Sequence, residues 1–503
     1  MLKNQILNNI RVTYSGLIAL LVSLIGVITG TVFVILITRK LTPDDFGLWT
    51  LLGSVLAYVL VIEPIVTYWS TRQVARGEKI GRTSISTAGL FSMAGIIVYL
   101  IIASYISESL ESNFSIFVLA GLLVPLMFLN NTLNSLCLGY KPQAVSFGLI
   151  VFETSKIPLG FLLVVGLELG IIGVLVAMIG ANVLKFIVLF ISARSQMRNA
   201  IQRNVIKFWF KMSWLTIYLS SSGLVYKLDV LIFSLMTNSL IGLAYWGVSQ
   251  TASSLITHSQ TVSQAVYPKL LGGGEKAIFE KNFQQLMYFS IPFLAASIIF
   301  AKPILHTLNP IYTDGIYIVI FVALRTFTDI IRSLFFSLIS AYETVDMDKE
   351  ASIKLYFKSK LFVLPTLIYV LSGSYVVILA IFLLFFKTPE MDEVFLVTIW
   401  AIIALVVHVP FAVYGFWITR SQYKVSLPYI PILKYSAVTL LSSVITYVVS
   451  LEILTYPQSI YEFLPEIISL LLLGGVLYFG LTYLIDIHTR KLFKSILKEI
   501  LKR

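Results

Sequence analysis

Residues 35–49 read ILITRKLTPDDFGLW and form a short polar hinge between two long apolar runs. The runs span residues 12–37 and 46–69. Each is longer than the roughly 20 apolar residues that an α-helix needs to cross a bilayer. The stretch therefore predicts a membrane hairpin, in which two spanning helices are joined by a tight turn.

The hinge has the chemistry of a helix start. Thr42 is a residue type that caps helices, and Pro43 suits the first helical position, where an N–H is not needed. Asp44 and Asp45 follow at the positive end of the helix dipole. We expect Gly47, which has no side chain, to let the two helices of the hairpin approach closely.

A weak echo of the hinge occurs about 195 residues later, as in transporters built from two related bundles. Residues 237–246 read TNSLIGLAYW and again precede a long apolar run. The loops that follow also match, RGEK at 76–79 and GGEK at 273–276. Chance is the alternative, because Gly and aromatic residues are common at helix ends.

The composition is that of a polytopic membrane protein. Of the 503 residues, 58% are hydrophobic and 12% are charged, and the mean hydropathy is +0.90. Soluble domains are about 45–50% apolar and about 25% charged. The single cysteine, Cys137, excludes an intramolecular disulfide. The first apolar run is too long for a cleavable signal peptide, so we expect it to remain as a helix.

Hydropathy predicts an all-α fold with about fourteen transmembrane helices. They are expected near residues 12–38, 46–69, 86–107, 115–138, 144–165, 171–191, 212–236, 240–266, 283–301, 315–341, 361–386, 394–418, 435–455 and 466–486. We interpret residues 1–211 as an N-terminal lobe of six helices and residues 212–434 as a C-terminal lobe of six. Residues 435–503 are interpreted as two additional helices and a basic amphipathic cytoplasmic tail.

The distribution of Lys and Arg predicts the orientation. With the N-terminus in the cytoplasm, the loops on that side carry most of these residues, and the opposite side carries only Arg39, Lys40, Lys302 and Lys387. The positive-inside rule therefore places both termini in the cytoplasm of a multi-pass protein of the plasma (cytoplasmic) membrane. This asymmetry and anionic lipid explain the net charge of +12 without nucleic acid as a partner.

Charges inside the apolar runs are candidate site residues, because each is costly in a membrane unless it is paired or hydrated. Arg325, Asp329 and Arg332 stand at spacings of four and three, on one face of a helix. One carboxylate cannot neutralise two guanidinium groups, so this face keeps a positive surplus. Guanidinium groups bind phosphate and carboxylate bidentately, so the three residues are the strongest candidate for a binding site.

Two further charged pairs are weaker candidates. Lys227 and Asp229 are two residues apart in the helix expected at 212–236, so they lie on different faces and each needs a partner from another helix. Glu153 and Lys156 can pair with each other. This spacing favours a structural pair over a ligand site.

The last two candidates are Glu63, which precedes Pro64, and His258, which the repeat would place opposite Glu63. For His258, a polar contact between helices and a functional role stay equally open. The sequence has no phosphate-binding Gly-rich loop, no zinc-ligand spacing and no nucleophile elbow. We therefore predict no catalytic residue, no metal and no cofactor.

Residues 41–49 also resemble a known hinge. In polysaccharide and O-antigen flippases of the multidrug/oligosaccharidyl-lipid/polysaccharide exporter superfamily, a Leu, a small residue or Pro, acidic residues and an aromatic–Gly pattern follow the first helix. This sequence reads LTPDDFGLW there. The resemblance extends in layout over most of the chain, with two lobes of six helices, short loops and two C-terminal helices.

The resemblance implies a transporter that flips a lipid-linked oligosaccharide from the cytoplasmic to the outer leaflet by alternating access. Arg325, Arg332 and Lys227 would then contact the phosphate or sugar head group. Four residues would orient these groups or couple transport to H⁺ or Na⁺, namely Asp329, Asp229, Glu63 and His258. The partners implied are the glycolipid, membrane lipids and glycan-assembly enzymes.

Two other functions compete with this interpretation. A cation-coupled multidrug exporter of the same superfamily would favour acidic residues for cationic substrates, and the two arginines argue against it. A membrane-embedded glycosyltransferase or polymerase could use Asp44 and Asp45 as a metal-binding pair. However, helix capping explains these acids, and no large outer loop exists to hold an acceptor. We therefore predict that the chain is not an enzyme.

Overall fold

The computed structural model describes residues 26, 28–263, 276–343, 353–388, 390–491 and 493–494. Every element in these residues is a helix, mostly α with short 3₁₀ and π segments. The predicted all-α class is therefore confirmed. The amphipathic tail predicted from His488 onward is only partly described, because residues 492 and 495–503 lie outside the described residues.

The hinge forms as predicted. A helix over residues 28–40 precedes it, and α2 (Pro43–Val59) begins directly after it. The Thr42 side chain accepts a hydrogen bond from the backbone N–H of Asp45 at 3.2 Å, with Pro43 in the first helical turn. Capping by Thr42 thus satisfies a backbone donor that the start of the helix would leave unpaired.

The role expected for Gly47 is wrong in one respect. A Cβ atom at this position would overlap the backbone carbonyl of Leu240. The absence of a side chain therefore admits the start of α11 (Leu240–Thr257), not the first helix of the hairpin. The physical reason for the glycine, a close backbone approach, is the one that we expected.

The echo of the hinge has matching cap chemistry. Ser239 precedes α11 and its hydroxyl accepts a hydrogen bond from the backbone N–H of Gly242 at 2.9 Å, as Thr42 does from Asp45. In each hinge, the helix that follows is therefore capped by a hydroxyl side chain, which accepts a hydrogen bond from the backbone N–H three residues later. This supports the repeat. Most of the second matching loop, 273–276, lies outside the described residues.

The chain divides into two compact units. The first comprises the residues up to Ala244 together with Ala380–Phe386, and the second comprises Tyr245–Leu379 and the residues from Lys387 onward. The lobes predicted at 1–211, 212–434 and 435–503 stay a prediction.

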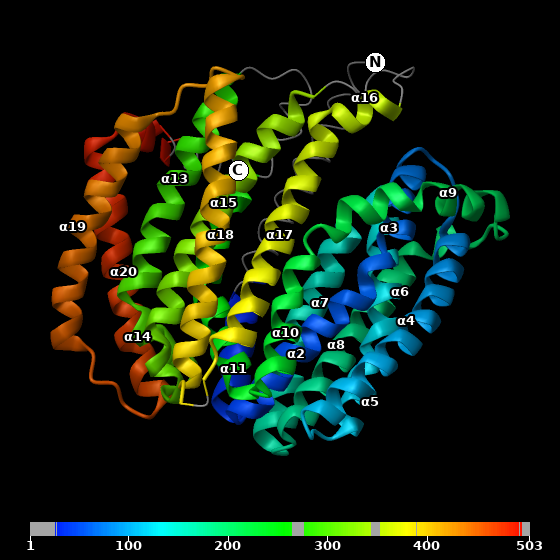
Figure 1. The fold of residues 1–503 in the computed structure, drawn as a ribbon, viewed down its shortest axis with the longest axis horizontal. Helices are drawn as coiled ribbons and strands as arrows, with labels where there is room; N and C mark the ends of the chain where they lie inside the picture. The colour runs from blue at the N-terminus through cyan, green and yellow to red at the C-terminus, as the bar shows by residue number, and fades with distance from the viewer. Residues whose placement is uncertain are drawn as a thin grey trace. The chain divides into compact units, whose positions relative to one another are not determined.

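The first unit is a bundle of helices (Figure 1). After α2 come η1 (Leu60–Ile62), α3 (Pro64–Ala75), α4 (Gly81–Ser109), α5 (Phe114–Gly121), α6 (Leu123–Tyr140), α7 (Gln143–Gly160), η2 (Phe161–Gly166), α8 (Gly170–Ala193), η3 (Arg194–Met197), α9 (Arg203–Ser221), η4 (Val225–Lys227) and α10 (Leu228–Thr237). Helix α6 packs against α3, α4 and α8. Its Leu133 and Leu136 meet Leu189 of α8 and Trp209 of α9 in a buried core.

The second unit is also a helical bundle. It contains most of α11, then η5 (His258–Ser263), α13 (Lys276–Ile299), α14 (Ala301–Leu308), η6 (Pro310–Gly315), α15 (Ile316–Ala341), α16 (Ile353–Lys358), α17 (Lys360–Phe385), α18 (Glu393–Ser421), α19 (Tyr429–Ile453) and α20 (Ile460–Ile485). Helix α15 packs along α18 and against α13. Phe283 of α13 and Phe335 of α15 stack with ring centroids 5.5 Å apart, which holds α15 in place from the side of α13.

Nine helices of the described chain are long and apolar enough to cross a membrane. A tenth span is formed if the pair Phe279–Ile299 and Ala301–Leu308, bent by 71°, counts as one. Helix α15 has 26 residues but is not among the nine, and it carries the three charges Arg325, Asp329 and Arg332. The chain is therefore a multi-pass membrane protein, and the predicted number of fourteen is not established.

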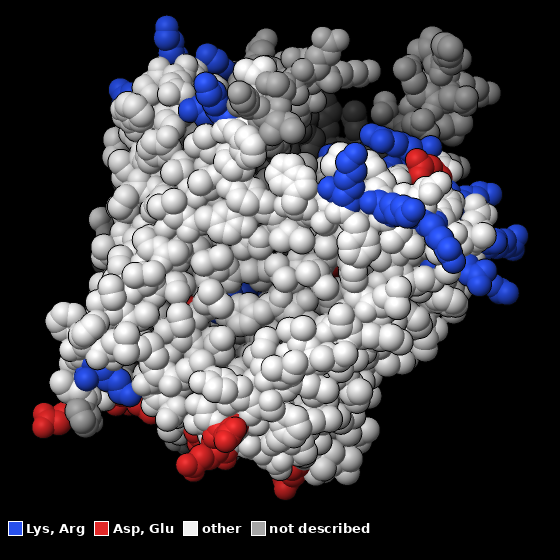
Figure 2. Space-filling view, turned by 45° about the vertical axis from the view of Figure 1, so that its right-hand side comes forward, with Lys and Arg blue, Asp and Glu red and all other residues white. Residues whose placement is uncertain are grey.

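The surface of the first unit agrees with this assignment. Figure 2 shows Lys and Arg side chains gathered over α9 and a broad area without charged side chains below them. On α4, Leu90, Ile97 and Ile101 are each more than 60% exposed. Such an apolar surface is expected where helices face lipid.

Several predicted helices are interrupted. The helix expected at 46–69 divides into α2, η1 and α3, and the helix expected at 115–138 divides into α5 and α6. The helix expected at 212–236 is split by a turn at residues 222–224, between α9 and α10, where the sequence reads SGL. The helix expected at 240–266 ends at Thr257 and continues as the 3₁₀ segment η5. The helix expected at 283–301 begins earlier, at Lys276, and bends after Ile299.

Candidate functional site

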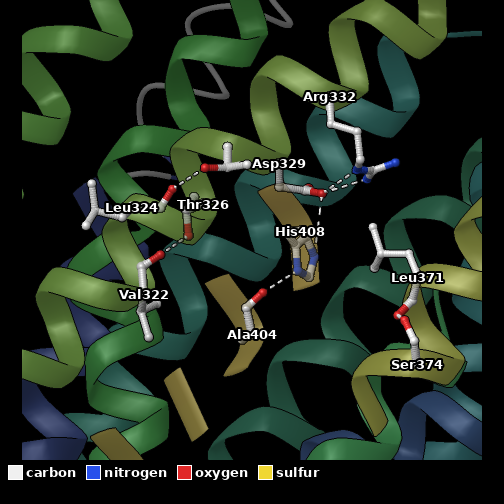
Figure 3. A network of polar contacts seen from close by, with 10 residues as sticks. Val322, Leu324, Thr326, Asp329, Arg332, Leu371, Ser374, Ala404 and His408 are labelled. Atoms are coloured by element: carbon white, nitrogen blue, oxygen red, sulfur yellow. Dashed lines mark hydrogen bonds and ion pairs between the residues drawn. The ribbon is translucent and has the colours of Figure 1, made fainter. Parts of the chain in front are cut away.

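The predicted stripe of charges lies on α15, an unbroken helix on which the spacing places Arg325, Asp329 and Arg332 on one face. Figure 3 shows Asp329 and Arg332 of this stripe. Asp329 accepts two hydrogen bonds from Arg332 at the same oxygen, Oδ1. One comes from Nη2 at 2.6 Å and one from Nε at 3.0 Å. The sequence thus predicted the helix face correctly, and the structure adds that Asp329 is engaged mainly by the arginine that follows it.

The two members of this ion pair differ in exposure. The Arg332 side chain is 11% exposed and the Asp329 side chain is 34% exposed. The Arg332 guanidinium also lies 5.2 Å from the centre of the Phe336 ring, within cation–π range. Arg325 lies one turn before Asp329 and is half-buried. The face therefore carries two cations and one anion at the edge of the protein interior.

His408 of α18 joins this cluster, although it was not among the residues predicted from the sequence. Its Nε2 lies 3.9 Å from Asp329 Oδ1, and its Nδ1 lies 2.6 Å from the backbone oxygen of Ala404 (Figure 3). The residue is 3% exposed. A signal was present, because His408 is one of only four histidines in the chain and stands in an apolar run.

The packing around His408 fixes its position. Tyr375 of α17 lies edge-on to the imidazole, with ring centroids 6.3 Å apart. The hydroxyl of Tyr375 accepts a hydrogen bond of 2.5 Å from Trp400 Nε1, and Trp400 stacks on Trp246 of α11 at 4.0 Å. Helices α11, α17 and α18 are thereby joined through aromatic side chains beside α15.

Glu153 and Lys156 form the ion pair that their spacing predicted. Lys156 Nζ lies 2.5 Å from Glu153 Oε2, and both residues are less than 10% exposed. The same oxygen accepts a hydrogen bond from the Thr29 hydroxyl at 2.7 Å. Lys156 Nζ also lies 5.6 Å and 5.3 Å from the rings of Phe33 and Phe152. Each charge is therefore compensated within the helix bundle of the first unit.

Glu63 lies between η1 and α3, where Pro64 begins a new helix. Its Oε2 accepts a hydrogen bond from Asn131 Nδ2 of α6 at 2.6 Å. Asn131 was not predicted as a partner from the sequence. The contact links the break before α3 to the neighbouring helix.

Lys227 and Asp229 are not in the middle of a helix, contrary to the prediction. Lys227 ends the 3₁₀ turn η4, and Asp229 lies in the first turn of α10. Asp229 is 2% exposed and its Oδ1 accepts a hydrogen bond from the backbone N–H of Val230 at 2.7 Å. The turn at residues 222–224 is the cause, because it moves Lys227 and Asp229 from a helix interior to the region of a helix start.

Lys227 lines a cavity of about 380 Å³ in the first unit, together with Gly53, Ala57, Leu60, Val61, Pro64, Met127 and Leu224. The cavity is apolar apart from Lys227. The hydroxyl of Tyr58 donates a hydrogen bond to the backbone oxygen of Lys227. The exposed side chain of Lys227 is therefore attached to a backbone that α2 holds in place.

The remaining candidate, His258, opens the 3₁₀ segment η5 and is half-buried. It belongs to the second unit, whereas Glu63, Glu153, Lys156, Lys227 and Asp229 belong to the first. Among the predicted site residues, the structure brings Glu153 together with Lys156 and Asp329 together with Arg332. No three His, Cys, Asp or Glu side chains gather as metal ligands in the part of the chain that the structure describes.

Comparisons with known proteins agree with this architecture. No protein-family model and no curated protein matches the sequence. Among solved structures, the lipid II flippase MurJ in its inward closed conformation matches with a TM-score of 0.64 and 13% identity, over 97% of this chain and 100% of that chain. An inward-facing multidrug resistance MATE family transporter of the MOP superfamily matches with a TM-score of 0.57 and 11% identity, over 80% of this chain and 96% of that chain. The chain has the fold of these transporters, which confirms the fold that the resemblance in the hinge implied.

Proposed function

We propose that this chain is a flippase for a lipid-linked oligosaccharide. It would move a polyprenyl-phosphate or polyprenyl-pyrophosphate glycan from the cytoplasmic to the outer leaflet by alternating access, for the synthesis of a cell-surface polysaccharide or glycan. Both termini lie in the cytoplasm and the membrane is the plasma (cytoplasmic) membrane, as the distribution of Lys and Arg predicts. The chain performs no bond-making chemistry in this proposal.

The observation that carries the proposal is the charge on α15. Helix α15 carries two arginines, Arg325 and Arg332, and one carboxylate, Asp329, so these three residues have a net charge of one positive unit with His408 neutral. Two arginines in a membrane helix are costly unless an anion or water compensates them. A phosphate or pyrophosphate group satisfies two guanidinium groups bidentately, which neither a neutral sugar nor a cationic drug can do.

The share of the chain that matches the fold of MurJ supports the same substrate class. The likeness to MurJ, whose name states that it flips lipid II, covers 97% of this chain, and the likeness to the MATE transporter covers 80%. A carrier for lipid-linked cargo must handle a charged head group and a long apolar tail together. The positive face on α15 supplies the first requirement, and Lys227 beside its apolar cavity is a second candidate contact with the head group.

A cation-coupled multidrug exporter is the second candidate, favoured by the likeness to the MATE fold. Such an exporter needs acidic groups that a cationic substrate can reach. Glu153 is already saturated by Lys156 and Thr29, and Asp329 is held by Arg332. These contacts leave the flippase as the better supported function.

The proposal can be tested by native mass spectrometry of the protein extracted gently from its own membrane. We expect a polyprenyl-linked glycolipid to remain bound to the wild type and to be lost from Arg325→Ala and Arg332→Ala. Arg420→Ala is the matched control, because Arg420 is an exposed arginine of the same unit whose Nη1 donates a hydrogen bond to the Tyr429 hydroxyl at 3.1 Å.

Two results would oppose the proposal. Retention of the glycolipid by both arginine variants would show that α15 does not hold the head group. Wild-type protein that carries only bulk phospholipid, and that binds a cationic dye such as ethidium, would favour the drug exporter.

A further inference from the structure

We propose that His408 is a proton-binding group whose protonation releases Arg332 from Asp329, so that a proton on His408 and an anion on Arg332 bind cooperatively. The inference rests on the proposed function for the identity of the anion. It rests on the geometry of α15 and α18 for the switch itself.

The tautomer of His408 follows from its contact with Ala404. A carbonyl oxygen only accepts hydrogen bonds, so the Nδ1 atom, 2.6 Å from the Ala404 oxygen, must carry a proton. A neutral imidazole has one N–H, and here it is therefore at Nδ1. A second proton can enter only at Nε2, the nitrogen that lies 3.9 Å from Asp329 Oδ1.

That oxygen is also the one that holds Arg332. Both hydrogen bonds from Arg332, at 2.6 Å and 3.0 Å, end on Asp329 Oδ1. With His408 neutral, Nε2 offers a lone pair toward the carboxylate, and Arg332 holds the oxygen. With His408 protonated, Nε2–H becomes a charge-assisted donor aimed at the same atom, and it competes with Arg332.

The surroundings make this competition effective. His408 is 3% exposed, so solvent screens its charge poorly, whereas the Asp329 side chain is 34% exposed. In the part of the chain that the structure describes, the charged and titratable groups around the imidazole include Arg325, Asp329 and Arg332 from α15 and Tyr375 from α17. The two arginines oppose the second proton, and Asp329 favours it.

The sign of the coupling follows from these charges. An anion that binds Arg325 and Arg332 removes the repulsion between these arginines and a protonated His408. It also draws Arg332 away from Asp329 Oδ1, which leaves that oxygen to the imidazolium. Anion binding therefore raises the proton affinity of His408, and by linkage a proton on His408 raises the anion affinity by the same factor.

The experiment is a pH titration of the full-length protein in detergent by NMR, with carbon-13 at Cε1 of histidine. The chain has four histidines, and the signal of His408 is the one that disappears in His408→Asn. Asparagine places an amide N–H near the position of Nδ1 and can keep the bond to Ala404. If that variant does not fold, His408→Gln assigns the signal instead.

Two substitutions and one ligand should move the His408 midpoint. We expect Arg332→Gln to raise it by about one pH unit, a tenfold change in proton affinity, and Asp329→Asn to lower it by a similar amount. Farnesyl pyrophosphate, a short prenyl pyrophosphate, should raise it in the wild type. His306 is the internal control, because it is 5% exposed in the same unit and its Nε2 lies 2.9 Å from the backbone oxygen of Pro457, a partner outside the α15 charge cluster.

The outcomes separate this inference from the proposed function. An unchanged His408 midpoint in Arg332→Gln overturns the switch, whatever farnesyl pyrophosphate does. If the midpoint rises in Arg332→Gln but farnesyl pyrophosphate has no effect in the wild type, the switch stands and the assignment of a prenyl pyrophosphate head group is wrong. If both the Arg332→Gln substitution and farnesyl pyrophosphate raise the His408 midpoint, the result supports both the switch and the assignment of a prenyl pyrophosphate head group.

Discussion

Two helices of this protein carry the same local pattern, an acidic residue followed three positions later by a basic one. On α7 the pair is Glu153 and Lys156, and on α15 it is Asp329 and Arg332. Both pairs close as ion pairs, at 2.5 Å and 2.6 Å. Their surroundings differ, and that difference separates a structural pair from a candidate site.

On α7 the charges balance and are enclosed. Glu153 Oε2 receives Lys156 and the Thr29 hydroxyl, and Lys156 lies against two aromatic rings. On α15 a second arginine, Arg325, leaves a positive surplus, and His408 shares the carboxylate oxygen that Arg332 uses. The spacing of an ion pair is therefore a poor guide to its role, whereas the sum of charges and the exposure of the acid are informative.

The largest effect is expected on the stability of the first unit. Lys156→Met leaves Glu153 buried without its cation and should cost about 3–5 kcal/mol in the free energy of unfolding. The double variant Glu153→Gln/Lys156→Met removes both charges and should recover most of this loss. Denaturant unfolding of the purified variants measures the free energy of unfolding of each. Equal stability of the single and double variants would mean that the two charges are not coupled.

The next effect distinguishes the two helices by function. Arg325→Ala or Arg332→Ala should reduce transport of a lipid-linked oligosaccharide in vesicles about 100-fold, equivalent to about 2.7 kcal/mol, because a charged contact with the head group is lost. Insertion and folding should be unaffected. The double variant at positions 153 and 156 should transport within about twofold of the wild type, since neither of these residues is assigned a transport role. If the α7 and α15 variants lost transport activity to a similar extent, the proposed difference in function between the two helices would be wrong.

A smaller effect is expected when Asp329 alone is neutralised. Asp329→Asn keeps the volume of the side chain but removes the charge that holds Arg332, so farnesyl pyrophosphate should bind about tenfold more tightly. Isothermal titration calorimetry at neutral pH measures this affinity. Weaker binding than in the wild type would mean that Asp329 orients Arg332 toward the anion and does not compete with it.

The sequence predicted what depends on neighbours along one helix. The cap at Thr42, the pair on α7 and the common face of Arg325, Asp329 and Arg332 all follow from spacings of three or four residues. The composition predicted the membrane-spanning class in the same way, because apolar length alone decides it. Each of these features depends on residues that are close together along the chain.

Contacts between helices were not predictable from one sequence. His408, Thr29 and Asn131 reach their acidic partners across 79, 124 and 68 positions of the chain, and only the packing register of the helices decides such meetings. The break between α9 and α10 had a local signal, the run SSSG at residues 220–223, which the apolar character of the segment masked. It moved Lys227 and Asp229 from a helix interior to a helix start.

The smallest expected effect concerns Thr29, which completes the compensation of Glu153. Its hydroxyl has one proton and lies 2.7 Å from Glu153 Oε2 but 3.3 Å from the Gly26 oxygen, so the carboxylate is the better acceptor. Thr29→Val keeps the shape and removes the donor, and it should cost about 1 kcal/mol in the free energy of unfolding, while Thr29→Ser should cost less. In the Lys156→Met background, Glu153 depends more on this one donor, so the same substitution should cost more there. An equal cost in both backgrounds would show that Thr29 and Lys156 act on Glu153 independently, and that the pair on α7 is less of a unit than its geometry indicates.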